Sequence, residues 1–557
     1  MEELIRKATQ EALDALGASG VSFAVEWPAD MAHGDYAVNA ALAASKTLGK
    51  SPREIAEALA PSIKAALRTH AQLVEIAGPG FINITLSKEA LDASVADATA
   101  EGWGKGATRA GSRVIFEYSC PNPFKEMHVG HLMNTVIGES VSRLIQNQGA
   151  TLTRDTYGGD VGPHVAKALW ALKDTSADTA NDLAKAYVQG ARAYEESDTT
   201  KQEIDSLNTA LYVALAKDEQ ERSDEERTLL ARWQEYRDMS YASHAKIWEF
   251  LGTKFDYIFH ESEATPVGMR IVADGLASGV FKESEGAVIY DGEKVGLHTL
   301  VFITSRATPT YEAKDVGLAF LKEERVESDA SYIMTGSEQV GHFRVFLAAL
   351  GEIAPALARK THHVPHGLLQ LTSGKMSSRA GNVITAQDIL EEVLAKATER
   401  NSDPLVAHDV AVGALKYMIL RSAPGGNVVF DPEKSLSLEG DSGPYLQYAL
   451  VRAKTILEKA AQPHEAVEGT ASDTGNEVLA RLIHRFPEVV RKAEVLHGPH
   501  ILVQYLTQLA GEWNSYYAHE RIIGAPDEAE KLQLARAFVA TLGTGLTLLG
   551  IPTPEKM

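Results

Sequence analysis

A regular pattern of apolar positions begins after His128, where hydrophobic residues recur at intervals of three and four. This spacing predicts an amphipathic helix. Just before it, residues 113–118 form a β-branched and aromatic run that predicts a buried strand, which Pro121 and Pro123 end. Strand, turn and helix in this order are typical of the opening of a doubly wound, Rossmann-like α/β sheet. The apolar positions of the helix are Leu132, Val136, Ile137, Val141, Leu144 and Ile145.

The remaining patterns divide the chain into three parts. Residues 1–85 alternate helix-like and strand-like pieces, among them a strand-like run at Val21–Val25. A helical, highly charged stretch covers about 180–252, Val288–Gly292 predicts a β-hairpin, and the chain beyond about 400 is almost wholly helical. We therefore predict a small N-terminal α/β domain (1–108), a Rossmann-like central domain (109–400) with an insertion at about 175–290, and an all-α C-terminal domain (401–557).

Composition excludes a membrane protein and a disulfide-bonded one. The 557 residues contain no apolar run near the roughly 18 to 20 residues that span a bilayer. Cys120 is the single cysteine, so no internal disulfide or paired-cysteine metal knuckle can form, which favours a reducing compartment. The N-terminal segment lacks the hydrophobic stretch of a signal peptide. We expect a cytoplasmic protein and a monomer.

The formal net charge of -21 repels a polyanion at long range. Salt screening confines that effect to about one Debye length, roughly 8 to 10 Å. A local basic or aromatic groove can therefore still bind RNA. Whether the protein binds RNA must be judged from its sequence motifs.

The first chemical motif, Ser119–His131, reads SCPNPFKEMHVGH and lies between the predicted strand and helix. Its histidines, three residues apart, share one face of the first helical turn, where free N–H groups and the helix dipole favour a phosphate. Gly130 lets a flat adenine or ribose approach the backbone closely. Two other interpretations stay open for the motif by itself: a metal-binding pair without an evident third ligand, and inert residues at a helix start.

The second motif, Gly374–Asn382, reads GKMSSRAGN. It is not a Walker P-loop, because Gly367 and Gly374 are too far apart and Met376 stands where a Mg²⁺-binding hydroxyl is needed. What remains is a small-residue loop with a lysine, hydroxyls and an arginine, a set suited to a pyrophosphate leaving group. Taken alone, the motif is also compatible with a solvated surface loop.

Together, in this order and context, the two motifs resemble the HIGH and KMSKS signatures of class I aminoacyl-tRNA synthetases. The resemblance implies that the two histidines bind ATP and stabilise its α-phosphate, and that Lys375 steadies the leaving pyrophosphate. Ser378 replaces the second lysine of KMSKS, so a positive charge is missing there. The implied ATP-binding residues are His128, Gly130, His131, Lys375, Met376, Ser377 and Ser378.

Arginyl-tRNA synthetases often lack that lysine and carry another just before HIGH, where this chain has Lys125. The chain resembles this family along its whole length. The resemblance implies an arginine–tRNA ligase that uses ATP and Mg²⁺, acts on tRNA(Arg) and has no protein-ligated metal; its catalytic groups would be Lys125, His128, His131 and Lys375. Further family blocks stand at Thr308–Asp315, Gly336–Phe343, Ser437–Ala449 and from Leu548 to the C-terminal residue.

An arginine substrate makes specific demands on its pocket. A guanidinium is planar and always charged, so it needs a bidentate carboxylate and neutral acceptors. Tyr311 and Asp315 lie four residues apart, on one face of a helix, and the resemblance implies that they bind the guanidinium. It also assigns Asn122 and Gln339 to the α-amino and carboxylate groups, and makes Glu117 a further arginine contact whose role stays open.

Candidate tRNA contacts lie in the terminal domains. The N-terminal domain resembles the family's additional domain, which contacts the tRNA elbow; there Phe81 can stack on an extruded base and Asn83 can bond to it, although Phe81 is equally compatible with a core position. The C-terminal domain resembles the family's anticodon-binding bundle. Its aromatic and polar candidates, most of them expected to be packing residues, are Tyr445, Gln447, Arg452, Trp513, Tyr516, Tyr517 and Arg521.

Other polar features are interpreted as structural. The histidines at 362, 363 and 366 lack a carboxylate or cysteine partner. Cys120 has no paired base and is not expected to be a nucleophile. Without the resemblance, Glu117 is a strand-end carboxylate that faces solvent, and Gln339 with His342 is a polar helix start.

Two alternative functions remain. One is a class I synthetase for another amino acid, but the Tyr311 and Asp315 pair argues against an apolar substrate. The other is a non-catalytic RNA-binding paralogue, which would be expected to lose His128, His131 or Lys375; all three are present.

Overall fold

The computed structural model describes residues 1–367, 369–371, 385–426, 428–462 and 476–557. They form two compact units: unit 1 is made of residues 1–104, 449–490 and 505–545, and unit 2 of residues 105–448, 491–504 and 546–557. Among the described residues, no helix is both long and apolar enough to cross a membrane. One unit boundary lies between Gly104 and Lys105, and the other four fall within helices: α17 (Gly443–Ala460), α18 (Asn476–Val495), α19 (Pro499–His519) and α20 (Glu528–Leu548).

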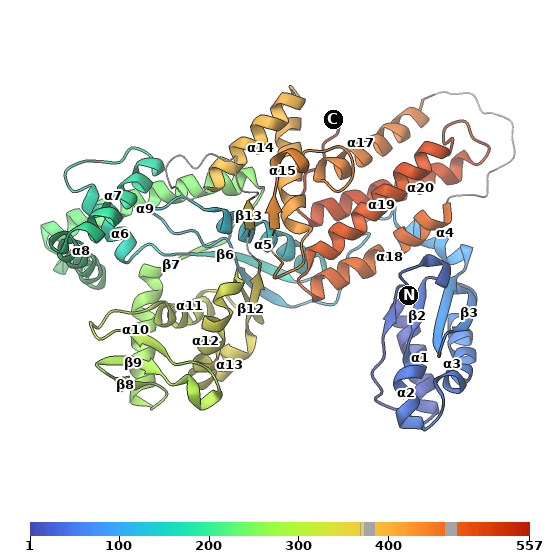
Figure 1. Cartoon of the computed structure of the whole chain (residues 1–557), viewed down its shortest axis with the longest axis horizontal. Coiled ribbons are helices and arrows are strands. Elements are labelled where there is room, and N and C mark those ends of the chain that lie inside the picture. The colour runs from blue at the N-terminus through green and yellow to red at the C-terminus, as the bar shows by residue number, and fades with distance from the viewer. Residues whose placement is uncertain (368, 372–384, 427, 463–475) are drawn as a thin grey trace. The chain divides into compact units, whose positions relative to one another are not determined.

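Unit 2 is built on a five-stranded parallel sheet with the strand order β12-β11-β5-β6-β7 (Figure 1). The chain runs outward from β5 through β6 to β7 and then returns to the other side of β5, so the strand order reverses there. Ligands of doubly wound sheets bind at such a reversal, beyond the carboxyl ends of the strands. The predicted Rossmann-like fold is confirmed. The strands are β5 (Arg113–Glu117), β6 (Thr151–Gly158), β7 (Tyr257–His260), β11 (Ala330–Gly336) and β12 (Thr361–His366).

The predicted helix after β5 is α5 (Val129–Asn147), which packs on β5, β6 and β11. The helices α10 (Glu261–Ala277) and α11 (Tyr311–Arg325) pack against each other with their backbones in contact. A Cβ added at Gly317 would lie 2.0 Å from the carbonyl oxygen of Ala264. Only glycine allows α11 to lie this close to α10, and α11 carries the predicted guanidinium-binding residues.

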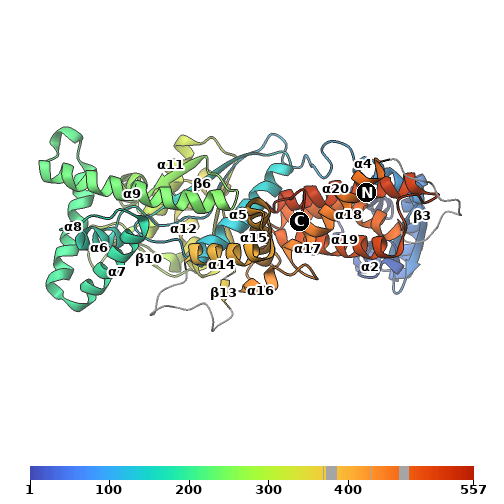
Figure 2. The same ribbon diagram turned by 90° about the horizontal axis from the view of Figure 1, so that it is seen from above.

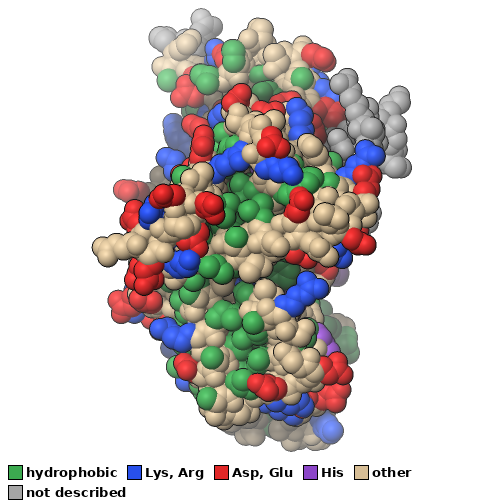
Figure 3. Space-filling view, turned by 90° about the vertical axis from the view of Figure 1, so that its left-hand side faces the viewer, with side chains coloured by type: hydrophobic (Ala, Val, Ile, Leu, Met, Phe, Trp, Pro, Cys, Tyr) green, Lys and Arg blue, Asp and Glu red, His purple; other side chains and the backbone are tan. Residues whose placement is uncertain are grey.

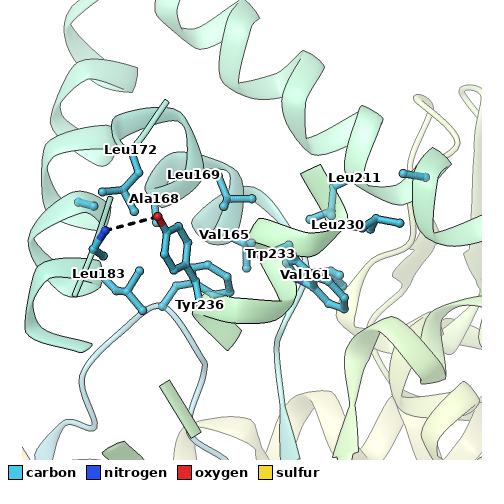
Figure 4. Packing of buried hydrophobic residues seen from close by; sticks show 14 residues of the cluster. Val161, Val165, Ala168, Leu169, Leu172, Leu183, Leu211, Leu230, Trp233 and Tyr236 are labelled. Carbon is cyan, nitrogen blue, oxygen red and sulfur yellow. Dashed lines mark hydrogen bonds between the residues drawn. The ribbon is translucent and has the colours of Figure 1, made fainter. Parts of the chain in front are cut away.

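Four helices between β6 and β7 form an insertion with its own hydrophobic core (Figure 4). Trp233, Tyr236 and Leu183 are buried there, and the Tyr236 hydroxyl accepts a hydrogen bond from the Ala177 N–H (3.4 Å). The long helix α9 is seen along its length in Figure 2. Figure 3 shows the face of the molecule that lies on the left in Figure 1, where acidic and basic side chains are intermixed. The helices are α6 (Pro163–Ala171), α7 (Ala180–Glu196), α8 (Asp198–Ala216) and α9 (Asp224–Phe250).

A three-stranded antiparallel sheet, ordered β10-β9-β8, follows α10. The hairpin predicted at Val288–Gly292 is misplaced. Its tight turn lies earlier, at Glu285 and Gly286, which both have positive φ (50° and 78°), while Gly292 begins a 3-10 turn (Gly292–Val295). The strands are β8 (Lys282–Ser284), β9 (Ala287–Tyr290) and β10 (Leu300–Ile303).

Among the remaining elements of unit 2, α12 and α13 contact β12, whereas α14 and α15 contact α5. Buried Lys416 fixes the end of the chain, because its ammonium donates to the carbonyl oxygens of Leu251 (2.7 Å) and Gly550 (2.6 Å). The elements are α12 (Val340–Ile353), α13 (Pro355–Lys360), β13 (Leu369–Leu371), α14 (Ala386–Arg400), α15 (Pro404–Leu420), β14 (Val428–Phe430) and α16 (Pro432–Ser435).

Unit 1 contains a four-stranded antiparallel sheet, ordered β1-β2-β4-β3, with helices packed on it. The strand predicted at Val21–Val25 is wrong apart from its last residue, because the chain extends only at β1. Glu488 of α18 accepts hydrogen bonds from the side chains of Trp27 (3.2 Å) and Tyr36 (3.0 Å). The elements are α1 (Glu2–Ala15), β1 (Val25–Glu26), β2 (Tyr36–Val38), α2 (Ala40–Leu48), α3 (Pro52–Leu67), β3 (Ala71–Ala77), β4 (Phe81–Leu86) and α4 (Lys88–Asp97).

Two predicted tRNA contacts are contradicted by burial. Trp513 is fully buried and stacks on Phe538 with ring centroids 4.5 Å apart, so it is a packing residue of the helical bundle. Asn83 is 5% exposed because it lies mid-strand in β4, between β2 and β3. Phe81, at the start of the same strand, is 38% exposed, and Arg521 is exposed as well.

These positions differ in their expected effect on stability. A Trp513→Ala variant should lose about 3–5 kcal/mol of unfolding free energy, since it leaves a large cavity. Arg521→Ala should stay within about 0.5 kcal/mol of wild type. Denaturant unfolding of the full chain measures both, and a Trp513→Ala protein as stable as wild type would contradict the packing role.

Candidate active site

The two histidines of the first motif form the N-terminal cap of α5. His128 is the cap residue: its Nδ1 accepts the Gly130 N–H (3.0 Å), and the Nδ1 of His131 accepts the His128 N–H (3.2 Å). The rings stack with centroids 3.8 Å apart. Both rings therefore use Nδ1 within the cap, which leaves each Nε2 for a ligand at the positive end of the helix dipole.

The electrostatics of this cap favour neutral rings. Burial lowers the pKa of His128, and nearby Lys125 lowers it further. Burial also lowers the pKa of His131 well below its usual value, helped by the adjacent His128. A neutral ring whose Nδ1 accepts a hydrogen bond carries its proton on Nε2. Both histidines can therefore donate from Nε2 to a phosphate oxygen.

The chain passes beside this cap a second time. Thr385 forms an isolated β-bridge with His128, and the Ala386 N–H donates to the Met127 carbonyl (2.7 Å). The second motif, with Lys375, Met376, Ser377 and Ser378, lies outside the described residues, which resume at Thr385. The first described residues after the second motif therefore lie next to the first motif.

Lys125 lies just before the cap, as predicted. Its ammonium lies 4.5 Å from the ring centre of Tyr187, which belongs to insertion helix α7. A cation–π contact of this kind holds the charge loosely, at about 0.5–2 kcal/mol. The insertion thus supplies a resting position for this lysine.

Asp315 pairs with His342, which the sequence by itself indicates only as part of a polar helix start. Its Oδ2 lies 2.6 Å from Nε2 of His342, whose Nδ1 lies 3.4 Å from Glu312. Burial opposes the charge of His342, but the two carboxylates outweigh it and raise the pKa of His342 to about 10. Burial raises the pKa of Asp315, and His342 counteracts this. Asp315 is therefore held in an ion pair at the edge of a cavity.

Glu117 does not face solvent. Its side chain is 5% exposed and binds the ammonium of Lys322, which also binds Asp155. Glu117 and Asp315 line the same small cavity beneath α11. The structure therefore brings two carboxylates from distant parts of the chain to one small cavity.

The other predicted arginine contacts lie after β5, after β11 and at the start of α11. Asn122 accepts the Gly159 N–H (3.1 Å), Tyr311 is 70% exposed, and Gln339 is exposed in the turn after β11. Sequence reasoning missed the buried pair of Lys314 and Glu261 (2.9 Å), because nothing in the spacing of these residues links α11 to the start of α10.

Two histidines of β12 and Cys120 contact other side chains of unit 2. His363 stacks on Phe343 with centroids 4.1 Å apart, and His366 approaches the side chain of Asn134 (3.2 Å). Among the described residues, no group of three or more His, Cys, Asp or Glu is placed to hold a metal. Burial, followed by the charge of Glu117, raises the pKa of Cys120, so its thiol stays protonated.

Comparison with known proteins agrees with this geometry. Three family models match successive parts of the chain: "Arginyl tRNA synthetase N terminal domain" (1–86), "tRNA synthetases class I (R), catalytic domain" (95–431) and "DALR anticodon binding domain" (446–557). The chain belongs to the arginyl-tRNA synthetase family. The resemblance inferred from the motifs is thereby confirmed.

Several arginyl-tRNA synthetases match this chain over its whole length. It is 30% identical over 577 residues to arginine–tRNA ligase of Streptococcus pneumoniae strain D39, covering 100% of both chains. It is similar to the solved Thermus thermophilus arginyl-tRNA synthetase, with a TM-score of 0.82, 26% identity and full coverage of both chains. The Plasmodium falciparum arginyl-tRNA synthetase shares the fold (TM-score 0.79, 19% identity, covering 100% of this chain and 98% of that one).

In this arginyl-tRNA synthetase, the raised pKa of His342 predicts a pH-dependent contribution to stability. The imidazolium is favoured in the folded protein over the unfolded chain, so its contribution is complete below about pH 6.5 and is lost as the pH rises through about 10. The difference in unfolding free energy between wild type and His342→Gln should therefore be largest near pH 6 and shrink toward pH 10. Denaturant unfolding across this range measures it; a difference independent of pH would contradict the ion pair.

Proposed function

We propose that this chain ligates arginine to tRNA(Arg) in two steps, with the residues of the candidate site in the roles that follow. The arginine carboxylate attacks the α-phosphorus of ATP; an oxygen–phosphorus bond forms, the bond to the β-phosphate bridge breaks, and pyrophosphate leaves. The terminal ribose 2′-hydroxyl of the tRNA then attacks the carbonyl of arginyl-adenylate, loses its proton, and AMP leaves.

The observation that carries this proposal is the return of the chain to His128 at Thr385. The two motifs are separated by more than two hundred residues, yet Thr385, the first described residue after the second motif, lies beside the cap formed by the first. We therefore expect the second motif to reach a nucleotide bound at the start of α5. This arrangement suits a reaction at the α-phosphate with pyrophosphate as the leaving group.

Adenylate formation needs little acid–base chemistry from the protein. In this proposal Nε2 of His128 and of His131 donate to the phosphate oxygens, and Gly130 leaves room for the nucleoside. Lys125 and Lys375 supply positive charge to the leaving pyrophosphate; Met376, Ser377 and Ser378 complete the ATP site. Catalysis then rests on positioning and on charge stabilisation. Mg²⁺ would bind together with ATP, through the phosphate oxygens of the nucleotide.

The guanidinium is proposed to lie between Asp315 and Glu117, with Tyr311 beside it. Asn122 and Gln339 are proposed to hold the α-amino and carboxylate groups. In this placement two carboxylates face one permanently charged guanidinium. Such charge pairing favours arginine over amino acids with neutral side chains.

For the RNA, the accessible candidates are Phe81, Tyr445 and Arg521. Phe81 presents an exposed ring that can stack on a base. Tyr445 is half-buried and Arg521 is exposed. We also propose the domain limits predicted from the sequence: 1–108 for the N-terminal domain, 109–400 for the central domain and 401–557 for the C-terminal domain.

The deciding experiment is ATP–pyrophosphate exchange with each of the twenty amino acids, with and without tRNA. Exchange that requires arginine supports the proposal, and a dependence on added tRNA would show that RNA completes the site. Exchange with another amino acid would retain the fold but overturn the pocket. A His131→Ala protein purified in parallel controls for contaminating host enzyme; if wild type is no more active than this control, the chain is a non-catalytic paralogue.

A further inference from the structure

A single buried lysine joins three elements beneath the candidate arginine site. The ammonium of Lys322 on α11 lies 2.5 Å from Oε2 of Glu117 on β5 and 2.6 Å from Oδ2 of Asp155 on β6. Glu117 and Asp155 are register partners on adjacent strands. All three side chains are at most 5% exposed. One cation therefore ties α11 to both strands.

The same helix carries Asp315 seven residues earlier. Seven residues are about two turns, so Asp315 and Lys322 lie on the same face of α11. Both line the cavity that Glu117 also lines. The Lys322–Glu117 bond thus fixes how far Glu117 on the sheet lies from Asp315 on the helix.

We propose that Lys322 is a positioning residue that determines specificity for arginine, because its ion pairs set the spacing of Glu117 and Asp315, the two carboxylates that receive the guanidinium. This inference rests on the proposed function. Lys322 does not touch the substrate; it acts through Glu117.

The charges explain why the position needs a cation. Two buried carboxylates on neighbouring strands repel each other, and one ammonium leaves the group with a single net negative charge that suits a cationic substrate. Burial raises the pKa of Asp155 to about 7 even though Lys322 opposes this. Without Lys322 no cation would lie between these two carboxylates, and nothing would hold Glu117 at its distance from Asp315.

A fixed spacing also explains discrimination by length. A rigid pair of carboxylates accepts a guanidinium at one distance from the α-carbon and strains homoarginine, which is one methylene longer. A misplaced methylene changes discrimination by roughly 10- to 200-fold. A pocket without the ion pair would adapt to either ligand.

The test uses the full chain and three variants. Lys322→Met removes the cation with little change in volume, and Lys322→Met combined with Asp155→Asn removes one charge of each sign. The matched control is Lys531→Met, because Lys531 is also a buried lysine between two carboxylates, Glu520 (2.9 Å) and Asp527 (3.2 Å), but lies in the helical bundle. Calorimetry at neutral pH measures the dissociation constants of arginine and homoarginine. Thermal unfolding measures stability.

Lys531→Met should lower the thermal midpoint without changing arginine affinity. The double variant should unfold at a higher temperature than Lys322→Met, because one of the two buried carboxylate charges is gone. It should still bind arginine at least about tenfold more weakly than wild type at neutral pH and lose about tenfold of its preference over homoarginine.

Two results would overturn the inference: wild-type arginine affinity and selectivity in Lys322→Met, or full recovery of both in the double variant, which would reduce Lys322 to the counter-ion of Asp155. Failure of the proposed function is a different result, in which wild-type protein itself does not bind arginine.

Discussion

An Asp315→Asn variant is expected to lose about two to three orders of magnitude in kcat/KM for arginine while its KM for ATP changes little. The amide keeps the size of the side chain but removes the charge that pairs with the guanidinium. Loss of one partner of a buried ion pair costs about 3–5 kcal/mol, and about 1.4 kcal/mol corresponds to a factor of ten. The partial exposure of Asp315 (21%) places the expected loss at the lower end of that range.

Glu312→Gln is the matched control for this variant. Glu312 lies on the same helix and contacts the same imidazole, at 3.4 Å. Its loss should disturb His342 to a similar extent but leave the guanidinium its counter-charge, so arginine kcat/KM should fall by less than about tenfold. ATP–pyrophosphate exchange at varied arginine concentration compares the two proteins. An unchanged arginine KM in Asp315→Asn would remove this residue from the pocket.

The parts of the fold that were predicted correctly are those in which local pattern and tertiary packing agree. The strand before Tyr118 and the helix after His128 have apolar residues at the period that their buried faces require, and both exist. The misplaced hairpin shows the opposite case. Asp291-Gly292 is a strong sequence signal for a tight turn, but the structure uses Glu285-Gly286 instead, because β9 pairs on both of its edges.

The residue spacing by itself indicates candidate site residues only where they are close in sequence, and Glu117, Asn122 and Gln339 were assigned through the family resemblance. The four-residue spacing of Tyr311 and Asp315 is a local signal, whereas the partner of Asp315 is His342, and that of Glu117 is Lys322, 205 residues away. Long-range ion pairs leave no periodic signal in one sequence. Burial is hidden for the same reason, so Trp513 and Arg521 look alike as RNA contacts until the packing of the bundle is known.

The capping role of His131 makes its two functions separable by mutation. Its Nδ1 accepts the His128 N–H, while Nε2 is the donor proposed for the α-phosphate. Asparagine places an oxygen near the position of Nδ1 and has nothing at Nε2. Glutamine reaches the position of Nε2 with an amide N–H but does not keep the short capping acceptor. The two variants therefore remove different halves of one imidazole.

His131→Asn should keep a thermal midpoint near wild type and lose about 10²- to 10³-fold in kcat of ATP–pyrophosphate exchange, the typical effect of removing one preorganised donor to developing charge. His131→Gln should lose about 0.5–2 kcal/mol of stability with the cap but retain more of the rate. Equal rates in the two variants would mean that Nε2 makes no contact in the transition state. The helix start would then be the whole role of this histidine, and the phosphate would be stabilised by His128 and the backbone N–H groups alone.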